Sequence, residues 1–167
     1  MSDTYKDILK SGDIFFIPLT IDFNEKPTKS YSRTKFPLDK HYAFGRFIED
    51  RQGSGVIIEV FSKTSTLDDF SFEEITGSGR LFSPVSVSGL EFTKKRWRVI
   101  SSDSSYNKNE DSNYDKVYLV SGFGDDLKLV NLGTNKSVPI SEIEAEKYES
   151  WRVWFPNQIE QRIKDNL

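Results

Sequence analysis

The chain has 167 residues, with 23 Lys or Arg, 26 Asp or Glu and a formal net charge of −3. That length predicts a single domain, residues 1–167, with a substantial core. The mild acidity disfavours a nucleic-acid partner, because binding to phosphates needs a basic surface. Cysteine is absent, which excludes disulfides, thiol nucleophiles and cysteine-ligated zinc. Aromatic residues make up 14% of the chain and favour a β-rich fold with aromatic side chains in its core.

The first seven residues contain neither a basic stretch nor an apolar run, so the sequence predicts no secretory signal. No stretch approaches the roughly 18 consecutive apolar residues that a membrane span needs. We therefore expect a cytoplasmic protein that makes no membrane contact.

The first predicted strand is Ile14-Phe15-Phe16-Ile17, which follows a turn at Ser11-Gly12-Asp13 and ends at Pro18. Residues 20–41 are polar and contain two prolines and four lysines. Because connections longer than about 12–15 residues are uncommon in compact domains, we interpret 20–41 as a long, partly mobile insertion.

Two β-rich runs, Tyr42–Glu49 and Val56–Phe61, are separated by a polar joint with two glycines. This pattern predicts a β-hairpin. Both faces of each strand carry apolar residues, so the hairpin is expected at the centre of a sheet that is covered on both sides. Gly45 within the first run indicates a bulge, a bend or the close approach of another backbone.

A short helix or a pair of 3₁₀ turns is predicted over residues 67–75, with Thr66 as N-cap and Asp69 three positions later. Strands are predicted within 81–88 and 94–100, and again within 117–120 and 127–132, with turns between them. The intervening segment 101–115 is rich in Ser, Asn and Asp, so we expect an exposed, mobile loop there.

Near the carboxyl end, Ser141 followed by Glu144 predicts a helix start, and residues 151–155 read as extended. Pro156 suits the first turn of a final helix, on which Ile159, Ile163 and Leu167 form one apolar stripe. The sequence thus predicts a β-dominated α+β fold. We expect a single twisted antiparallel sheet or partly open barrel, with a short mid-chain helix and a C-terminal helix packed on it.

Few residues are suited to catalysis. The one histidine, His41, could act as a general base with a nearby carboxylate, which leaves an enzyme as one open alternative, although a surface histidine is the simpler interpretation. No spacing typical of a metal site or a phosphate-binding loop is present, so no metal and no cofactor are predicted.

A second alternative is a small β-barrel module that binds single-stranded nucleic acid through Lys94, Lys95, Arg96 and Trp97, because such proteins combine cations with an aromatic side chain. The competing interpretation is that Trp97 packs inward while the cations stay in water.

Acidic side chains offer a different kind of surface. Asp68, Asp69, Glu73 and Glu74 lie on one short element, and four glutamates lie between residues 142 and 149. Such groups are either simply solvated or complementary to a basic protein partner, for which they raise the association rate and add specificity. The first four are our candidate partner-binding residues, together with the loop Thr20–His41.

Several of these stretches together resemble the immunity protein 26 family of bacterial polymorphic toxin systems. The similarity extends over residues 11–101 and rests on four stretches: Ser11-Gly12-Asp13-Ile14-Phe15-Phe16-Ile17-Pro18-Leu19, Tyr42-Ala43-Phe44-Gly45-Arg46-Phe47, Val56-Ile57-Ile58-Glu59-Val60-Phe61 and Lys95-Arg96-Trp97-Arg98-Val99-Ile100. The chain departs from the family pattern at Thr20–His41, where the family has a short turn.

The resemblance implies a non-enzymatic protein that binds and neutralises a cognate toxin domain in the cytoplasm of the cell that produces the toxin. It identifies neither the toxin nor the contact residues.

Overall fold

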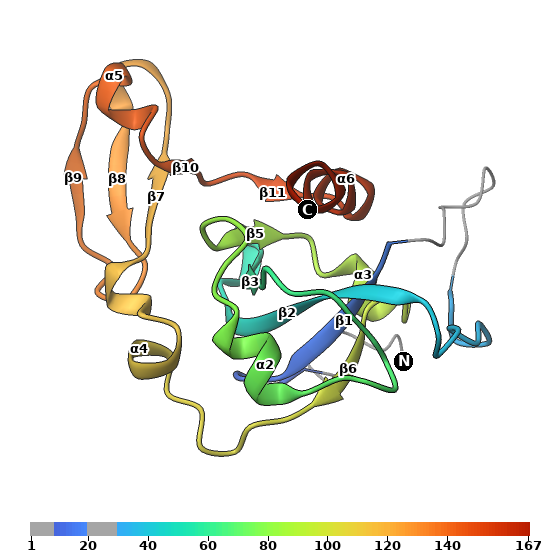
Figure 1. Ribbon diagram of the computed structural model, residues 1–167. Helices are drawn as coiled ribbons and strands as arrows, with labels where there is room; N and C mark the ends of the chain where they lie inside the picture. Colours follow the sequence, from blue (N-terminus) through green and yellow to red (C-terminus); the bar gives the residue numbers. More distant parts are fainter. Residues whose placement is uncertain (1–8, 20–29) are drawn as a thin grey trace.

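The computed structural model describes residues 9–19 and 30–167, whose strands form a larger and a smaller sheet (Figure 1). The strands of the larger sheet are β1 (Ile14–Pro18), β2 (His41–Asp50), β3 (Val56–Val60), β4 (Ser65–Thr66), β5 (Val85–Val87), β6 (Arg98–Ser101) and β11 (Val153–Trp154). Those of the smaller sheet are β7 (Tyr118–Ser121), β8 (Lys128–Asn131), β9 (Ser137–Pro139) and β10 (Glu149–Ser150). The α-helices are α2 (Phe72–Gly77), α3 (Leu90–Thr93), α4 (Lys108–Asp111), α5 (Glu142–Ala145) and α6 (Pro156–Asn166). Short 3₁₀ turns lie at Gln52–Ser54, Tyr114–Lys116 and Gly124–Asp126.

The predicted hairpin forms the middle of the larger sheet. Its strands run in the order β11-β5-β3-β2-β1-β6, and β4 pairs with β2. All pairs are antiparallel except β11 with β5, which is parallel. The β-dominated α+β class is therefore confirmed. The predicted single sheet accounts for only part of the structure, because β7 to β10 form a separate sheet.

Gly45 is explained by a close approach. A Cβ at this position would lie 2.6 Å from the ring of Phe15 and 3.0 Å from the backbone oxygen of Glu59. The irregularity in the pairing of β2 with β3 falls instead between Phe47 and Glu49. Glycine is required at position 45 because the Phe15 ring packs against the backbone there.

Three clusters of buried apolar side chains cover the two faces of the larger sheet. On one face, Phe47 and Ile58 pack with Trp97 and with Ile159 and Ile163 of α6. On the other face, one cluster joins residues of β1 and β2 to α2. A third cluster packs the far end of the hairpin against the smaller sheet. The expected core on both sides of the hairpin is confirmed.

The C-terminal helix packs on the larger sheet as predicted. Pro156 is its first residue, and Ile159 and Ile163 are fully buried, whereas Leu167 at the chain end is exposed. The helix also buries Glu160, which accepts hydrogen bonds from Arg96 at 2.7 and 2.8 Å. A buried ion pair and an apolar stripe together hold α6 in place.

The mid-chain helix begins later than predicted. The hydroxyl of Thr66 accepts a hydrogen bond from the backbone N–H of Asp69 at 3.2 Å, but the chain there forms a turn. Helix α2 starts at Phe72, and Ser71 is its N-cap, accepting a hydrogen bond from the N–H of Glu74 at 3.3 Å. Two capping patterns occur in succession, and the buried Ile75 belongs to the second.

Segment 101–115 contains more structure than the predicted loop. Most of its residues are exposed, yet it includes α4 and the start of a 3₁₀ turn, and it buries Ser112 and Tyr114. In the other long connection, residues 20–29 lie outside the described part of the chain. Within its described remainder, Tyr31 and Phe36 are buried.

Candidate partner-binding site

Helix α2 and the segment around α4 border a groove on the face of the larger sheet opposite α6. The groove consists of two hollows of about 400 and about 330 Å³, which share Thr76 and Asp111. The first hollow is lined by Arg46, Phe72, Glu73, Thr76, Gly77, Asp103, Glu110 and Asp111. The second is lined by Glu59, Phe61, Thr76, Gly79, Arg80, Asp111, Ser112 and Asn113. We call this the α2–α4 groove.

The floor of the groove is a buried network of charges. Arg46 and Glu59 face each other across β2 and β3, with Nε and Oε1 3.5 Å apart. Arg80 donates two hydrogen bonds to Oε2 of Glu59, at 3.1 and 2.9 Å, and the hydroxyl of Ser112 donates to Oε1 at 3.1 Å. Because Glu59 is only 2% exposed, these partners offset the loss of its hydration.

Arg46 lies between two aromatic rings, with its guanidinium 5.3 Å from the ring centre of Phe61 and 5.1 Å from that of Tyr106. Among the residues that the structure describes, its Nε has no hydrogen-bond partner and only forms the ion pair with Glu59. The Tyr106 hydroxyl shares a hydrogen bond with Ser112 at 2.7 Å, and burial raises the pKa of Tyr106 to about 12. Tyr106 is therefore neutral at pH 7, and its ring face stabilises the Arg46 cation.

The rim of the groove is acidic. Glu73 comes from α2, and Asp103, Glu110 and Asp111 come from the segment after β6. In the described part of the chain, none of the four forms an ion pair with a lysine or arginine. The two hollows together are lined by five carboxylates and two guanidinium groups, so the formal charge of the lining is −3. Such a surface attracts a cationic group.

The structure separates the four acids that the sequence singled out. Glu73 lines the groove. Glu74 is paired with Lys63, Nζ to Oε2 2.5 Å, and the hydrogen bond from Lys63 lowers the pKa of Glu74. Asp68 and Asp69 are exposed in the turn before α2 and do not belong to the lining.

Sequence reasoning missed Asp103, Glu110 and Asp111, because they were assigned to a featureless loop. They reach the groove because β6 pairs with β1. The chain leaves β6 at Ser101, which is paired with Ile14 of β1, and Ile14 is paired in turn with Arg46 of β2. No local sequence pattern predicts the pairing of β6 with β1.

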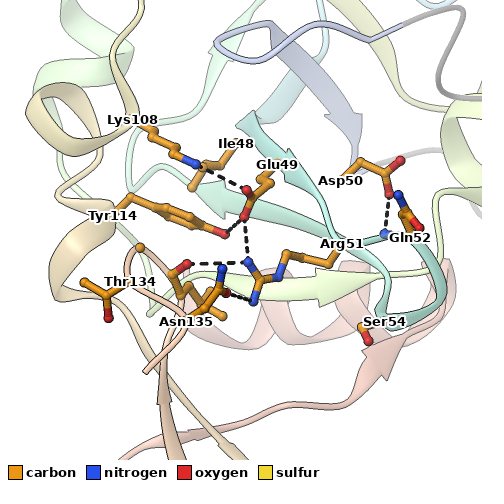
Figure 2. Close-up of polar contacts among 12 residues, drawn as sticks. Ile48, Glu49, Asp50, Arg51, Gln52, Ser54, Lys108, Tyr114, Thr134 and Asn135 are labelled. Carbon is orange, nitrogen blue, oxygen red and sulfur yellow. Dashed lines mark hydrogen bonds and ion pairs between the residues drawn. The ribbon is translucent and has the colours of Figure 1, made fainter. Parts of the chain in front are cut away.

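A second polar cluster joins β2 to the smaller sheet (Figure 2). Glu49 accepts hydrogen bonds from the Tyr114 hydroxyl, from Lys108 at 3.2 Å and from Arg51 at 3.2 Å. Arg51 also donates to the side-chain oxygen of Asn135 at 2.6 Å. Burial raises the pKa of Glu49, but the hydrogen bonds from Tyr114 and Lys108 outweigh burial and leave the pKa below its usual value. Glu49 therefore stays ionised and binds Lys108 of α4 and Tyr114 of the 3₁₀ turn before β7, while Arg51 links it to Asn135 in the turn between β8 and β9.

The residues proposed to bind single-stranded nucleic acid, Lys94, Lys95, Arg96 and Trp97, do not form one exposed surface patch. Trp97 is fully buried and Arg96 is 2% exposed. The indole N–H of Trp97 donates to Glu160 at 2.9 Å, and the Arg96 guanidinium binds the same carboxylate. The prediction that Trp97 packs inward is confirmed, whereas the idea that Arg96 stays in water is wrong. Stacking on bases needs an exposed ring, which Trp97 does not offer.

His41, the centre of the enzyme alternative, is exposed at the start of β2. Its Nδ1 lies 3.5 Å from the Thr64 hydroxyl, and no ion pair joins it to a carboxylate of the described residues. Within ranges 9–19 and 30–167, no three acidic or histidine side chains are grouped to hold a metal ion. The described helices are too short or too polar to cross a membrane.

The fold is β-dominated, and the α2–α4 groove is an acidic hollow on the face of its larger sheet opposite α6. In a comparison with protein families, the family model of immunity protein 26 matches residues 10–127, and the chain belongs to this family. No match was found among curated proteins or among solved structures.

Proposed function

We propose that this protein neutralises a cognate bacterial toxin domain by direct, stoichiometric binding in the cytoplasm, without catalysis, and that the α2–α4 groove receives a basic side chain of the toxin. Family membership supports the role of an immunity protein. The observation that carries the choice of site is the convergence of four carboxylates from two distant segments, Glu73 with residues 103–111, around one hollow.

The physical basis is the difference between rim and floor. The floor charges are already paired within the protein, so the partner need not neutralise them. The rim carboxylates have no cation of their own among the described residues, so a lysine or arginine of the toxin gains attraction without displacing an internal ion pair. Exposed Asp68 and Asp69, next to α2, extend the negative potential that steers the encounter. Inhibition follows by occlusion of the toxin's active cleft or by trapping of an inactive conformation.

The test uses the toxin domain that we expect an adjacent gene to encode, co-expressed with this chain in a sensitive host. We expect the unaltered chain to restore growth and to bind the purified domain in a one-to-one complex by calorimetry. The triple variant Glu73→Lys, Glu110→Lys, Asp111→Lys is expected to weaken binding at least 100-fold, because like charges would then face each other.

The matched control is Asp165→Lys, which reverses an exposed acid on α6, on the opposite face of the sheet. It should bind within about twofold of the unaltered chain. If the triple variant neutralises and binds the toxin as well as this control does, the groove is not the contact site. If the unaltered chain neither binds nor protects, direct neutralisation of this toxin is refuted.

A further inference from the structure

The far end of the smaller sheet exposes the two most accessible large apolar side chains of the described residues. Phe123, in the turn between β7 and β8, is 85% exposed, and Ile143 on α5 is 76% exposed. Val138 on the edge strand β9 is 55% exposed. Single exposed apolar residues are ordinary, but two so accessible at one end of a small sheet indicate a contact surface.

Both segments lie at the same end of the smaller sheet, as Figure 1 shows for α5 and the turn beside it. The N–H of Ile140, just before α5, donates to the carbonyl of Leu127 at 3.2 Å, just after the turn. At the opposite end of the smaller sheet, Asn135 lies in the turn between β8 and β9 and accepts a hydrogen bond from Arg51, which directly follows β2 of the larger sheet. We call the free end, residues 122–127 and 140–146, the distal tip.

The backbone of the distal tip is held by local hydrogen bonds and by close packing. Gly122 has φ +85°, and a Cβ there would lie 2.4 Å from the backbone oxygen of Asp126. The N–H of Asp126 in turn donates to the carbonyl of Phe123 at 3.1 Å, which closes the turn. In α5, the Ser141 hydroxyl caps the N–H of Glu144 at 3.2 Å. A side chain presented by a preformed backbone loses little entropy on binding, as interface anchors do.

Acidic side chains accompany these anchors. Asp125, Asp126, Glu142, Glu144 and Glu146 are all exposed within the distal tip or at its border. A second copy of the chain related by two-fold symmetry would bring the same carboxylates face to face, which disfavours self-association through this surface. A basic partner surface has the opposite charge and gains from both the attraction and the apolar contact.

From this combination we infer that the distal tip is a second docking surface for the cognate toxin domain, at which Phe123 and Ile143 enter an apolar depression surrounded by basic residues. The inference rests on the proposed function and adds a contact that is separate from the α2–α4 groove. The cluster in Figure 2 supports simultaneous contact, because Glu49 of β2 binds Lys108 of α4, which borders the groove, and also binds Arg51, which in turn binds Asn135 of the smaller sheet's β8–β9 turn.

The experiment measures the affinity and kinetics of the full chain with the purified toxin domain. Phe123→Ala and Ile143→Ala should each weaken binding 10- to 100-fold through faster dissociation. Leu38→Ala is the matched control, since Leu38 is a 56% exposed leucine outside the tip and should leave affinity unchanged. The double variant Asp126→Lys, Glu142→Lys should instead slow association and reduce its dependence on salt.

Together the outcomes distinguish failure of the distal tip from failure of direct neutralisation. If the unaltered chain binds and both alanine variants bind equally well, the distal tip is refuted while direct neutralisation stands. If the unaltered chain does not bind the domain, both are refuted. If sedimentation shows a dimer of the free chain that Phe123→Ala disperses, the tip joins two copies of this chain and the inference is overturned. Thermal denaturation of each variant checks that the loss does not come from unfolding.

Discussion

The substitution Glu91→Gln tests how a buried carboxyl group affects the pH dependence of the free energy of unfolding. Glu91 lies on α3 and is 1% exposed. Neither carboxylate oxygen has a hydrogen-bond partner in the described part of the chain. Burial, assisted by the nearby carboxylate of Glu160, raises the pKa of Glu91 to about 8. In the unfolded chain a glutamate titrates near pH 4.3.

The sign of the effect follows from proton binding. Between about pH 4.5 and pH 8 the folded protein binds a proton at Glu91 that the unfolded chain does not. The free energy of unfolding therefore falls as the pH rises, by about 1.4 kcal/mol per pH unit. From pH 5 to pH 7 the expected loss is about 3 kcal/mol, a large part of the stability of a domain this size.

Urea denaturation at pH 5, 6 and 7 measures this slope. Glu91→Gln stays uncharged, so we expect its stability to fall less with pH, by about 3 kcal/mol less over that range than in the unaltered chain. The raised pKa of Glu160 gives a slope of the same sign, but it remains in both proteins. Glu142→Gln removes a carboxylate from an exposed position and should keep the original slope. Equal slopes for Glu91→Gln and the unaltered chain would refute the reasoning.

The remaining predictions concern buried charge and close packing. Arg96→Met leaves the Glu160 carboxylate buried without its cation and should lower the free energy of unfolding by about 3–5 kcal/mol in urea denaturation; a loss below about 1 kcal/mol would contradict this. Gly45→Ala places a methyl group 2.6 Å from the Phe15 ring and should cost about 1–3 kcal/mol by the same assay. Gly53→Ala meets no atom within 4 Å and is the control, and equal costs for the two would show that the Phe15 contact is not the cause.

Several local features could be read from the sequence because their causes lie within a few residues. The alternation of β-prone residues predicted β2 and β3, and Pro156 with the spacing of Ile159 and Ile163 predicted α6. The start of α2 was predicted too early in the chain because Thr66 and Ser71 both satisfy a capping pattern. The helix begins after Ser71, where it can bury Ile75.

The candidate site was less predictable. Glu73 was singled out from its own sequence neighbourhood, and it does line the groove. Asp103, Glu110 and Asp111 were not, because their position depends on the pairing of β6 with β1. The sequence also does not show that Arg96 is buried whereas Lys94 is half-buried. Arg96 is buried with its partner Glu160, which lies on a helix more than 60 residues further along the chain.

The sequence by itself determined the β-rich class, the central hairpin, the final helix and the family resemblance, since periodicity, caps and short motifs act over a few residues. Tertiary structure alone decided the separate smaller sheet, the buried partners of Glu49 and Glu59 and the shape of the α2–α4 groove. The physical reason is that burial and charge pairing depend on which distant segments come into contact. Strand pairing across long connections determines those contacts.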